Sequence, residues 1–344
     1  MEVLITTPMR PRDAERIAGE EGVELSYLPE LLPAARWSGD TVGEGGVPLD
    51  DARWQPALEN AEVVFGIPGS SAEGLVDLVG RAPRLSWVQA RNAGAGEQLG
   101  AALELTGGEL GAVTVTTSSG VHAGPLAEFA IFGLLAFAKD LPKLLADQRA
   151  RHWPPGQQPV GELRGRTLLL VGVGAIGTET ARLASAFGMH VIAVKRELSG
   201  GIAHVDELHP VGELRALVAR ADAIVITLPA TDATRGLLDA DTLAAVKPGA
   251  VLVNVGRGTV VDEAALAQRL QDGTLAGAAL DVFAEEPLPE DSPLWGLENV
   301  IVSPHGIALV EAEEPRIVEL FIDNLRRRLA GRPLRNALDP DVLY

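Results

Sequence analysis

The sequence predicts an α/β protein made of two doubly wound parallel-sheet domains with a cleft between them. Short apolar runs rich in β-branched residues alternate with helical stretches along most of the chain, a pattern typical of parallel sheets covered by helices. The length of 344 residues exceeds the size at which one hydrophobic core usually stops growing, and 47% hydrophobic residues can fill two cores. We therefore expect each domain to have its own sheet and core.

The first α/β series contains five expected strands, at residues 3–6, 23–27, 62–65, 85–89 and 113–116. Residues 30–56 interrupt it with two tryptophans, glycines and prolines but no clear period. A segment of this length is either a functional loop or contains an element that the pattern does not reveal. Both interpretations remain open from the sequence.

The second series begins after a helical period over residues 123–151, which predicts one long helix, with a bend or break at Pro142 as the alternative. Six strands follow, at 167–171, 190–194, 223–227, 250–254, 277–281 and 300–303. A final helix over 311–330 is expected to return to the first domain. The first domain is thus placed at residues 1–118, completed by 310–344, and the second at 119–309.

Composition and charge exclude several classes of site and partner. The chain has no cysteine, which removes disulfides, thiolate metal sites and a Cys nucleophile, and no two histidines have the i, i+4 helical spacing of a zinc site. A net charge of −18 disfavours nucleic acid as a partner. The apolar stretch 126–138 contains Glu128 and is too short to span a membrane, and the N-terminus lacks a signal-peptide pattern, so we expect a cytoplasmic protein.

A dinucleotide site is predicted by Gly172, Gly174 and Gly177, which spell G-x-G-x-x-G between an apolar strand and a helix. The first glycine permits a tight turn, the second allows backbone to approach a pyrophosphate, and the third permits helix–strand packing. The second domain is therefore expected to be Rossmann-like, and the first a related flavodoxin-like sheet. Lys195 and Arg196 follow the next strand, where an NAD site usually offers an acid; their charges favour NADP, unless Glu197 contacts the ribose and NAD is bound.

Three polar residues, Arg257, Glu286 and His305, each follow a predicted strand, in the motifs NVGRG, DVFAEEP and VSPHG. A guanidinium, a carboxylate and an imidazole together suit reversible hydride transfer to a 2-oxo acid, because they supply an anion ligand, an acid/base and a partner for that acid/base. Each residue alone could be an ordinary surface residue. Their occurrence together at strand ends favours a catalytic site.

These motifs, with TVTTSSGVHAGPLAEFAIFGLLAF, KPGAVLVNVGRGTVVDEAAL and AGAALDVFAEEPLP, resemble those of D-isomer-specific 2-hydroxyacid dehydrogenases, among them glyoxylate/hydroxypyruvate reductases. The resemblance implies that Arg257 binds the carboxylate and carbonyl of the substrate. It also implies that His305 exchanges a proton with the carbonyl oxygen and that Glu286 pairs with His305. The further residues implied to bind cofactor are Ala175, Ile176, Leu228, Pro229, Val255, Gly256 and Asp281, with Arg257 and His305 also adjacent to it.

The same resemblance assigns the stretch NAGAGEQL to a loop whose backbone N–H groups, from Ala95 and Gly96, hold the substrate carboxylate. Glu97 and Gln98 depart from the family pattern, in which an apolar residue and an Asp continue this loop. Family members also dimerise through the 124–153 helix, with Trp153 near the neighbouring active site or packed locally. A homodimer is therefore expected.

The substrate we expect is a small unphosphorylated 2-oxo acid, such as glyoxylate or hydroxypyruvate, reduced with NADPH. The alternatives are an NAD-dependent dehydrogenase of the D-lactate or phosphoglycerate type and a non-enzymatic dinucleotide-sensing regulator on the same fold. Arg91, just before the carboxylate loop, could bind a phosphate or be a surface residue.

Overall fold

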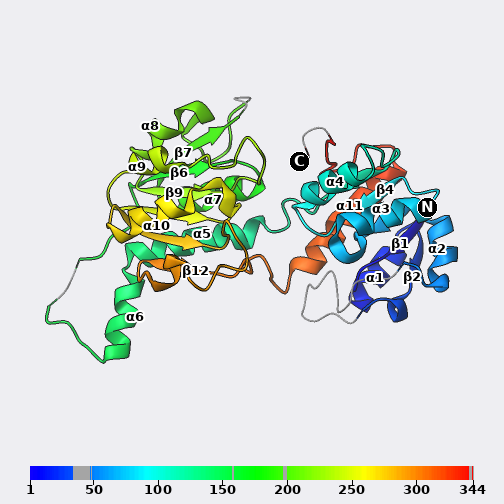
Figure 1. Cartoon of the computed structure of the whole chain (residues 1–344), viewed down its shortest axis with the longest axis horizontal. Coiled ribbons are helices and arrows are strands. Elements are labelled where there is room, and N and C mark those ends of the chain that lie inside the picture. The colour runs from blue at the N-terminus through cyan, green and yellow to red at the C-terminus, as the bar shows by residue number, and fades with distance from the viewer. Residues whose placement is uncertain (34–46, 48, 157–158, 197–199, 341–342, 344) are drawn as a thin grey trace. The chain divides into compact units, whose positions relative to one another are not determined.

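The computed structural model describes residues 1–33, 47, 49–156, 159–196, 200–340 and 343. The chain forms two compact units, one of Met1–Val121 with Leu309–Tyr344 and the other of His122–Ala308 (Figure 1). Each unit has one parallel sheet, of five and seven strands. The predicted fold class, two parallel α/β domains, is confirmed.

The first unit has the strand order β2-β1-β3-β4-β5. The strands are β1 Glu2–Ile5, β2 Glu24–Tyr27, β3 Val63–Phe65, β4 Trp87–Gln89 and β5 Thr114–Thr116, and the helices are α1 Pro11–Ala18, α2 Gln55–Asn60, α3 Ala72–Arg81, α4 Ala95–Leu105 and α11 Glu313–Leu329. Side chains alternate along each strand, so one sheet face packs against α3 and α4 and the other against α1 and α11. The final helix therefore returns to the first unit, as predicted.

Aromatic packing fixes α11 to this sheet. The ring of Phe321 lies 4.8 Å from that of Phe65 and 5.2 Å from that of Trp87, measured between centroids. All three side chains are fully buried. Aromatic pairs at such distances add to the free energy of burial, so this contact stabilises the return of the chain.

The irregular segment 30–56 contains structure that the sequence pattern did not reveal. Short 3₁₀ helices form at Pro29–Leu31 and Ala52–Trp54, and α2 begins at Gln55. Trp54 is fully buried in the core. The interpretation as a missed element thus holds for the end of the segment, while residues 34–46 and 48, with the other tryptophan, lie outside the described residues.

The second unit has the strand order β12-β11-β10-β9-β6-β7-β8. Its strands are β6 Thr167–Val171, β7 His190–Lys195, β8 Glu207–Pro210, β9 Ala223–Ile226, β10 Ala250–Asn254, β11 Leu275–Leu280 and β12 Val300–Val302; α5 Ala123–Ala138, α6 Leu141–Ala150, α7 Ala175–Ala186, α8 Leu214–Val218, α9 Ala240–Ala244 and α10 Glu263–Gln271 are its helices. The order reverses between β6 and β9. In such sheets ligands bind at the carboxyl ends of the strands beside the reversal.

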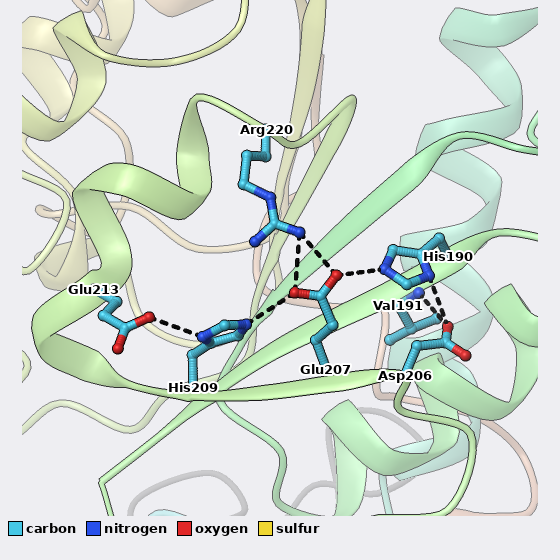
Figure 2. Close-up of polar contacts among 7 residues, drawn as sticks. All are labelled: His190, Val191, Asp206, Glu207, His209, Glu213 and Arg220. Carbon is cyan, nitrogen blue, oxygen red and sulfur yellow. Dashed lines mark hydrogen bonds and ion pairs between the residues drawn. The ribbon is translucent and has the colours of Figure 1, made fainter.

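The prediction of six strands was wrong, because β8 is a seventh. His209 lies within this strand, which pairs with β7. Polar side chains fix it: the Glu207 carboxylate accepts hydrogen bonds from Arg220 at 2.7 and 2.9 Å and lies 2.7 Å from His190 Nε2 and 3.0 Å from His209 Nε2 (Figure 2). An edge strand held by ion pairs, with the sequence ELHP, lacks the apolar run that marks a strand.

The prediction of one uninterrupted helix over 123–151 was wrong, and the alternative of a break near Pro142 is what the structure shows, since the segment forms α5 and α6. Asp140, between them, has a left-handed backbone with φ of 55°. Pro142 has no N–H to bond to the Ala138 carbonyl, which instead accepts from the Gly161 N–H at 2.8 Å. Within the described part of the chain, no helix is long and apolar enough to cross a membrane.

Candidate active site

The glycine-rich turn follows β6 and leads into α7. Gly172 has φ of 103°, and its carbonyl accepts a hydrogen bond from the Thr227 hydroxyl at 3.0 Å. A Cβ on Gly177 would lie 2.3 Å from the Gly172 carbonyl oxygen, so the helix packs closely against the turn. A Cβ on Gly174 would meet no described atom within 4 Å. The turn thus has the open backbone and the helix N-terminus that a pyrophosphate group requires.

The residues proposed to discriminate between cofactors lie at the carboxyl end of β7, the strand next to β6. Lys195 is the last residue of β7 and is half-buried, and Arg196 follows it with an exposed side chain. Both cations are therefore at the strand end where the second ribose of a dinucleotide binds in this fold. Glu197, the alternative ribose ligand, lies outside the described residues.

Arg257 lies in a turn held by Asn254, the last residue of β10. The Asn254 side chain accepts a hydrogen bond from the Gly256 N–H and donates one to the Arg257 carbonyl, both at 3.0 Å. A Cβ on Gly256 would lie 2.6 Å from the carbonyl oxygen of Leu228, so the turn also packs on the loop after β9. The Arg257 guanidinium donates to the Gly256 carbonyl at 2.9 Å.

Glu286 and His305 are in direct contact. His305 Nδ1 lies 2.7 Å from Glu286 Oε2, and the other Glu286 oxygen accepts from the Phe283 N–H at 3.0 Å. The two side chains are 46% and 37% exposed, so a ligand can reach the pair. With Nδ1 engaged by the carboxylate, Nε2 is the ring nitrogen available for proton exchange.

Asp281 holds the loop that carries His305. Its buried carboxylate oxygen Oδ1 accepts hydrogen bonds from the Ser303 hydroxyl at 2.6 Å and the Gly306 N–H at 3.1 Å. These bonds flank His305, whose φ of 52° is uncommon for a residue other than glycine. The structure therefore gives Asp281 a bracing role, and its implied contact with nicotinamide stays a prediction.

The three predicted catalytic residues follow neighbouring strands, because β10, β11 and β12 are adjacent in the sheet. The loops after β10 and β11 also touch: a Cβ on Gly258 would lie 1.8 Å from the carbonyl carbon of Phe283. The remaining predicted cofactor residues share this sheet edge, with Ala175 and Ile176 in the first turn of α7, Leu228 and Pro229 after β9, and Val255 after β10. Among the described residues, no group of three or more histidines and acids is arranged to hold a metal ion.

The predicted carboxylate loop, in the first unit, follows β4 and begins α4. Ala95 and Gly96 are the first two residues of α4, whose first N–H groups have no intrahelical acceptor. Gln98, which departs from the family pattern, donates to the Ser70 carbonyl at 2.7 Å, and its Oε1 lies 3.4 Å from Asn92 Nδ2. Gln98 thus connects the loop to the segment after β3. Sequence reasoning missed this bracing role, as it missed that of Asn254.

Arg91 is a buried residue, contrary to the suggestion that it lies at the surface. Its side chain is 3% exposed, and Nη1 donates to the Pro8 carbonyl at 2.8 Å and lies 3.8 Å from Glu314 Oε1. The guanidinium carbon is 5.8 Å from the centre of the Phe65 ring. Arg91 therefore connects the end of β4 to the segment after β1 and to α11, and desolvation lowers the pKa of its guanidinium.

Known proteins are similar to this chain in both sequence and fold. Residues 131–306, more than half of the chain, match the family model of the D-isomer specific 2-hydroxyacid dehydrogenase NAD binding domain. The chain is 36% identical over 224 residues to (S)-sulfolactate dehydrogenase of Chromohalobacter salexigens, covering 64% of this chain and 71% of that protein. It is 33% identical to glyoxylate/hydroxypyruvate reductase B of Pectobacterium carotovorum, covering 84% of this chain and 88% of that protein.

D-3-phosphoglycerate dehydrogenase of Mycobacterium leprae is 32% identical over 91% of this chain, which spans only 59% of that protein. Among solved structures, a D-isomer specific 2-hydroxyacid dehydrogenase from Xanthobacter autotrophicus, in complex with NADPH and MES, is 29% identical. It matches 99% of each chain with a TM-score of 0.77. The chain therefore belongs to the D-isomer specific 2-hydroxyacid dehydrogenase family.

Proposed function

We propose that this protein is an oxidoreductase that interconverts a small 2-oxo acid and its D-2-hydroxy acid with a nicotinamide cofactor. The observation that carries the proposal is the 2.7 Å contact between Glu286 and His305, placed one strand away from Arg257. An imidazole paired through Nδ1 with a carboxylate can be protonated at Nε2 and remain oriented. Such a pair can serve as both the acid of reduction and the base of oxidation.

In reduction, the His305 imidazolium gives its Nε2 proton to the carbonyl oxygen of the substrate while the carbonyl carbon accepts a hydride. The nicotinamide, when bound, supplies that hydride and is oxidised. Arg257 binds the substrate anion through its forked donors. We propose that the N–H groups of Ala95 and Gly96 also bind the substrate carboxylate. Glu286 stabilises the imidazolium before the transfer.

Several observations support the proposed cofactor, NADPH. Lys195 and Arg196 are two cations at the end of β7, and neither that strand nor Arg196 after it contributes an acidic residue. Paired cations favour binding of a 2′-phosphate. The solved relative from Xanthobacter autotrophicus contains NADPH. Purified protein should use NADPH with a higher kcat/KM than NADH. An equal or higher kcat/KM with NADH would refute this choice.

The substrate we propose is glyoxylate or hydroxypyruvate. The similarity to a glyoxylate/hydroxypyruvate reductase over 84% of the chain supports it. The alternatives are an NAD-dependent dehydrogenase of the D-lactate or phosphoglycerate type and a non-enzymatic sensor of dinucleotides. A panel of 2-oxo acids, including phosphorylated and sulfonated ones, assayed with both cofactors separates these possibilities, since a sensor binds the dinucleotide without turnover.

The role of His305 is tested by His305→Ala. Loss of a positioned acid/base should lower kcat by about 10²–10⁴-fold and leave the dissociation constant for NADPH nearly unchanged. His204→Asn is the matched control, because His204 is exposed and distant from His305 in the chain, and asparagine tolerates its positive φ. Retained turnover in His305→Ala would refute the mechanism.

We further propose that the two units are a substrate-binding domain and a dinucleotide-binding domain, and that the protein is a cytoplasmic homodimer formed through residues 124–153. Exposed apolar side chains on this segment support the dimer: Trp153 is 93% exposed, and Phe132 and Leu144 are also exposed. Light scattering should give about twice the chain mass of 36.1 kDa. A mass equal to that of one chain would refute the dimer.

A further inference from the structure

The C-terminal segment that follows α11 covers the free edge of the first sheet. β5 is an edge strand, and its neighbour Thr117 donates from its N–H to the Asn336 carbonyl at 2.9 Å. Ala337 forms an antiparallel bridge with Thr116, and the Leu338 N–H donates to the Val115 carbonyl at 2.8 Å. Figure 1 shows this segment in red beside α4. The segment thus acts as an extra strand before it reaches the helix.

Leu343 then lies directly against the first turns of α4. A Cβ built on Gly96 would be 1.9 Å from the Leu343 carbonyl oxygen, and a Cβ on Gly100 would be 2.8 Å from Leu343 Cδ1. Gly96 and Gly100 are four residues apart and share one face of α4. The Leu343 N–H donates to the Asp339 carbonyl at 2.7 Å, which fixes this contact to the rest of the segment. The absence of a side chain at Gly96 is therefore what lets the C-terminal backbone approach.

The first turn of α4 has no side-chain N-cap. Its N-cap residue is Gly94, and the turn Ala93–Gly96 consists of alanine and glycine. Gln98 fixes one side of the turn through Ser70. Leu343 contacts it at Gly96, where the backbone carries the N–H that is proposed to bind the substrate.

We propose that Leu343 is a positioning residue for the substrate loop, acting through Gly96. The inference rests on the proposed function, because it assumes that the N–H groups of Ala95 and Gly96 bind the substrate carboxylate. Hydrogen bonds to a bound anion depend steeply on geometry, so a small displacement of the first turn weakens substrate binding. The C-terminal segment thereby contributes to substrate affinity without touching the substrate.

A purely structural role for Leu343 makes a different prediction. Leu343 and Leu338 both pack against the same core, so a structural role would give the two residues similar effects on stability and none on the KM of the 2-oxo acid. Leu338→Ala removes the same apolar atoms from the same segment but not the contact at Gly96. It is the matched control for Leu343.

The test combines Gly96→Ala with removal of residues 343 and 344. In the full chain, Gly96→Ala keeps the N–H but forces the turn away from Leu343, and the KM of the 2-oxo acid should rise about tenfold. The kcat and the dissociation constant for NADPH should stay within about twofold. In the shortened chain, whose KM is already raised, Gly96→Ala should add less than about twofold.

The result that overturns the inference is a Gly96→Ala penalty of equal size with and without Leu343, or no penalty in either chain. Gly80→Ala, in α3, is the control for the substitution itself, because a Cβ there meets no described atom within 4 Å. If the shortened chain does not fold, the same comparison is made with Gly100→Ala, measured in the wild-type chain and in the Leu343→Ala variant. Leu343→Ala should then relieve the rise in KM.

Hydrogen exchange separates failure of this inference from failure of the proposed function. Without turnover on any 2-oxo acid the proposed function fails, yet the amides of Leu99 and Gly100, which bond to the carbonyls of the first turn of α4, still report on Leu343. They should exchange faster in the shortened chain than in the full chain, while Leu338→Ala leaves them unchanged. Equal exchange rates in the full and shortened chains would overturn the contact as a positioning device.

Discussion

Replacing Glu286 by glutamine separates the charge of this residue from its geometry. The glutamine Oε1 can still accept from the Phe283 N–H, and its NH2 group then faces His305 Nδ1, to which it can donate only when the ring is neutral and Nδ1 carries no proton. What disappears is the attraction between carboxylate and imidazolium. The structure therefore predicts a loss of rate without a loss of fold.

The size of the loss follows from the distance and the exposure. Charge centres about 4 Å apart interact by about 1 kcal/mol in water and about 4 kcal/mol near a protein surface at an effective dielectric of 20. Both side chains are more than a third exposed, so solvent screening places the value near the lower half of that range, about 2 kcal/mol. A barrier raised by about 2 kcal/mol lowers kcat/KM about 30-fold.

The assay is steady-state reduction of the preferred 2-oxo acid at neutral pH, with Glu285→Gln as the matched control. Glu285 is the adjacent carboxylate, is exposed and carries the same charge. Its substitution tests whether any loss of negative charge in this loop slows the reaction. Wild-type kcat/KM in Glu286→Gln, or equal losses in the two variants, would refute the reasoning.

Two further predictions concern stability. Hydrogen bonds from Arg220 and from two histidines lower the pKa of Glu207 to about 2. The charged Glu207 therefore contributes fully to folding stability above about pH 4.3, the pKa in the unfolded chain, and this contribution is lost as the pH falls toward 2. The difference in Tm between the wild type and Glu207→Gln should become smaller over that pH range, and a constant difference would contradict the prediction. Arg91→Met should lower the free energy of unfolding by about 2 kcal/mol, because a buried pair with Glu314 and a hydrogen bond are lost. Urea unfolding measures this against Arg81→Met, an exposed i, i+4 pair in α3 that should change stability by less than about 0.5 kcal/mol.

The sequence carried enough information to predict most strands, because buried parallel strands are continuous apolar runs. β10, for example, reads AVLVN and is wholly buried. β8 was missed for the converse reason: its residues are half-buried, two of the four are polar, and Glu207 is held by His190 and Arg220, which are 17 and 13 residues away in the chain. The periodicity of apolar residues indicates which side chains are buried, but it does not indicate which charged side chains pair with one another.

The break between α5 and α6 shows a second limit. The sequence offered a bend or break at Pro142 as an alternative, and the break falls at Asp140, two residues earlier. A proline leaves the carbonyl four residues before it without a hydrogen-bond donor. The residue at which the helix ends then depends on which other donor bonds to that carbonyl. Here the Gly161 N–H does so, across an intervening segment that the local pattern does not describe.

The candidate site divides in the same way. The placement of Arg257, Glu286 and His305 after neighbouring strands could be predicted, because parallel strands bring their carboxyl ends to one edge of the sheet. The residues that hold these side chains in place could not be predicted, because such a role depends on which hydrogen-bond partner lies nearby in the folded structure. Asn254 is visible in sequence only as a polar residue at the end of an apolar strand.

Gly96 is the sharpest case of this division. By resemblance it supplies an N–H to the substrate, and any residue but proline has an N–H. The structure gives a reason for glycine itself: the Leu343 carbonyl occupies the position that a side chain would take. Gly96 is therefore subject to two requirements in this chain: the substrate contact implied by the resemblance, and the close approach of Leu343. Only a substitution that keeps the N–H, tested with and without Leu343, separates them.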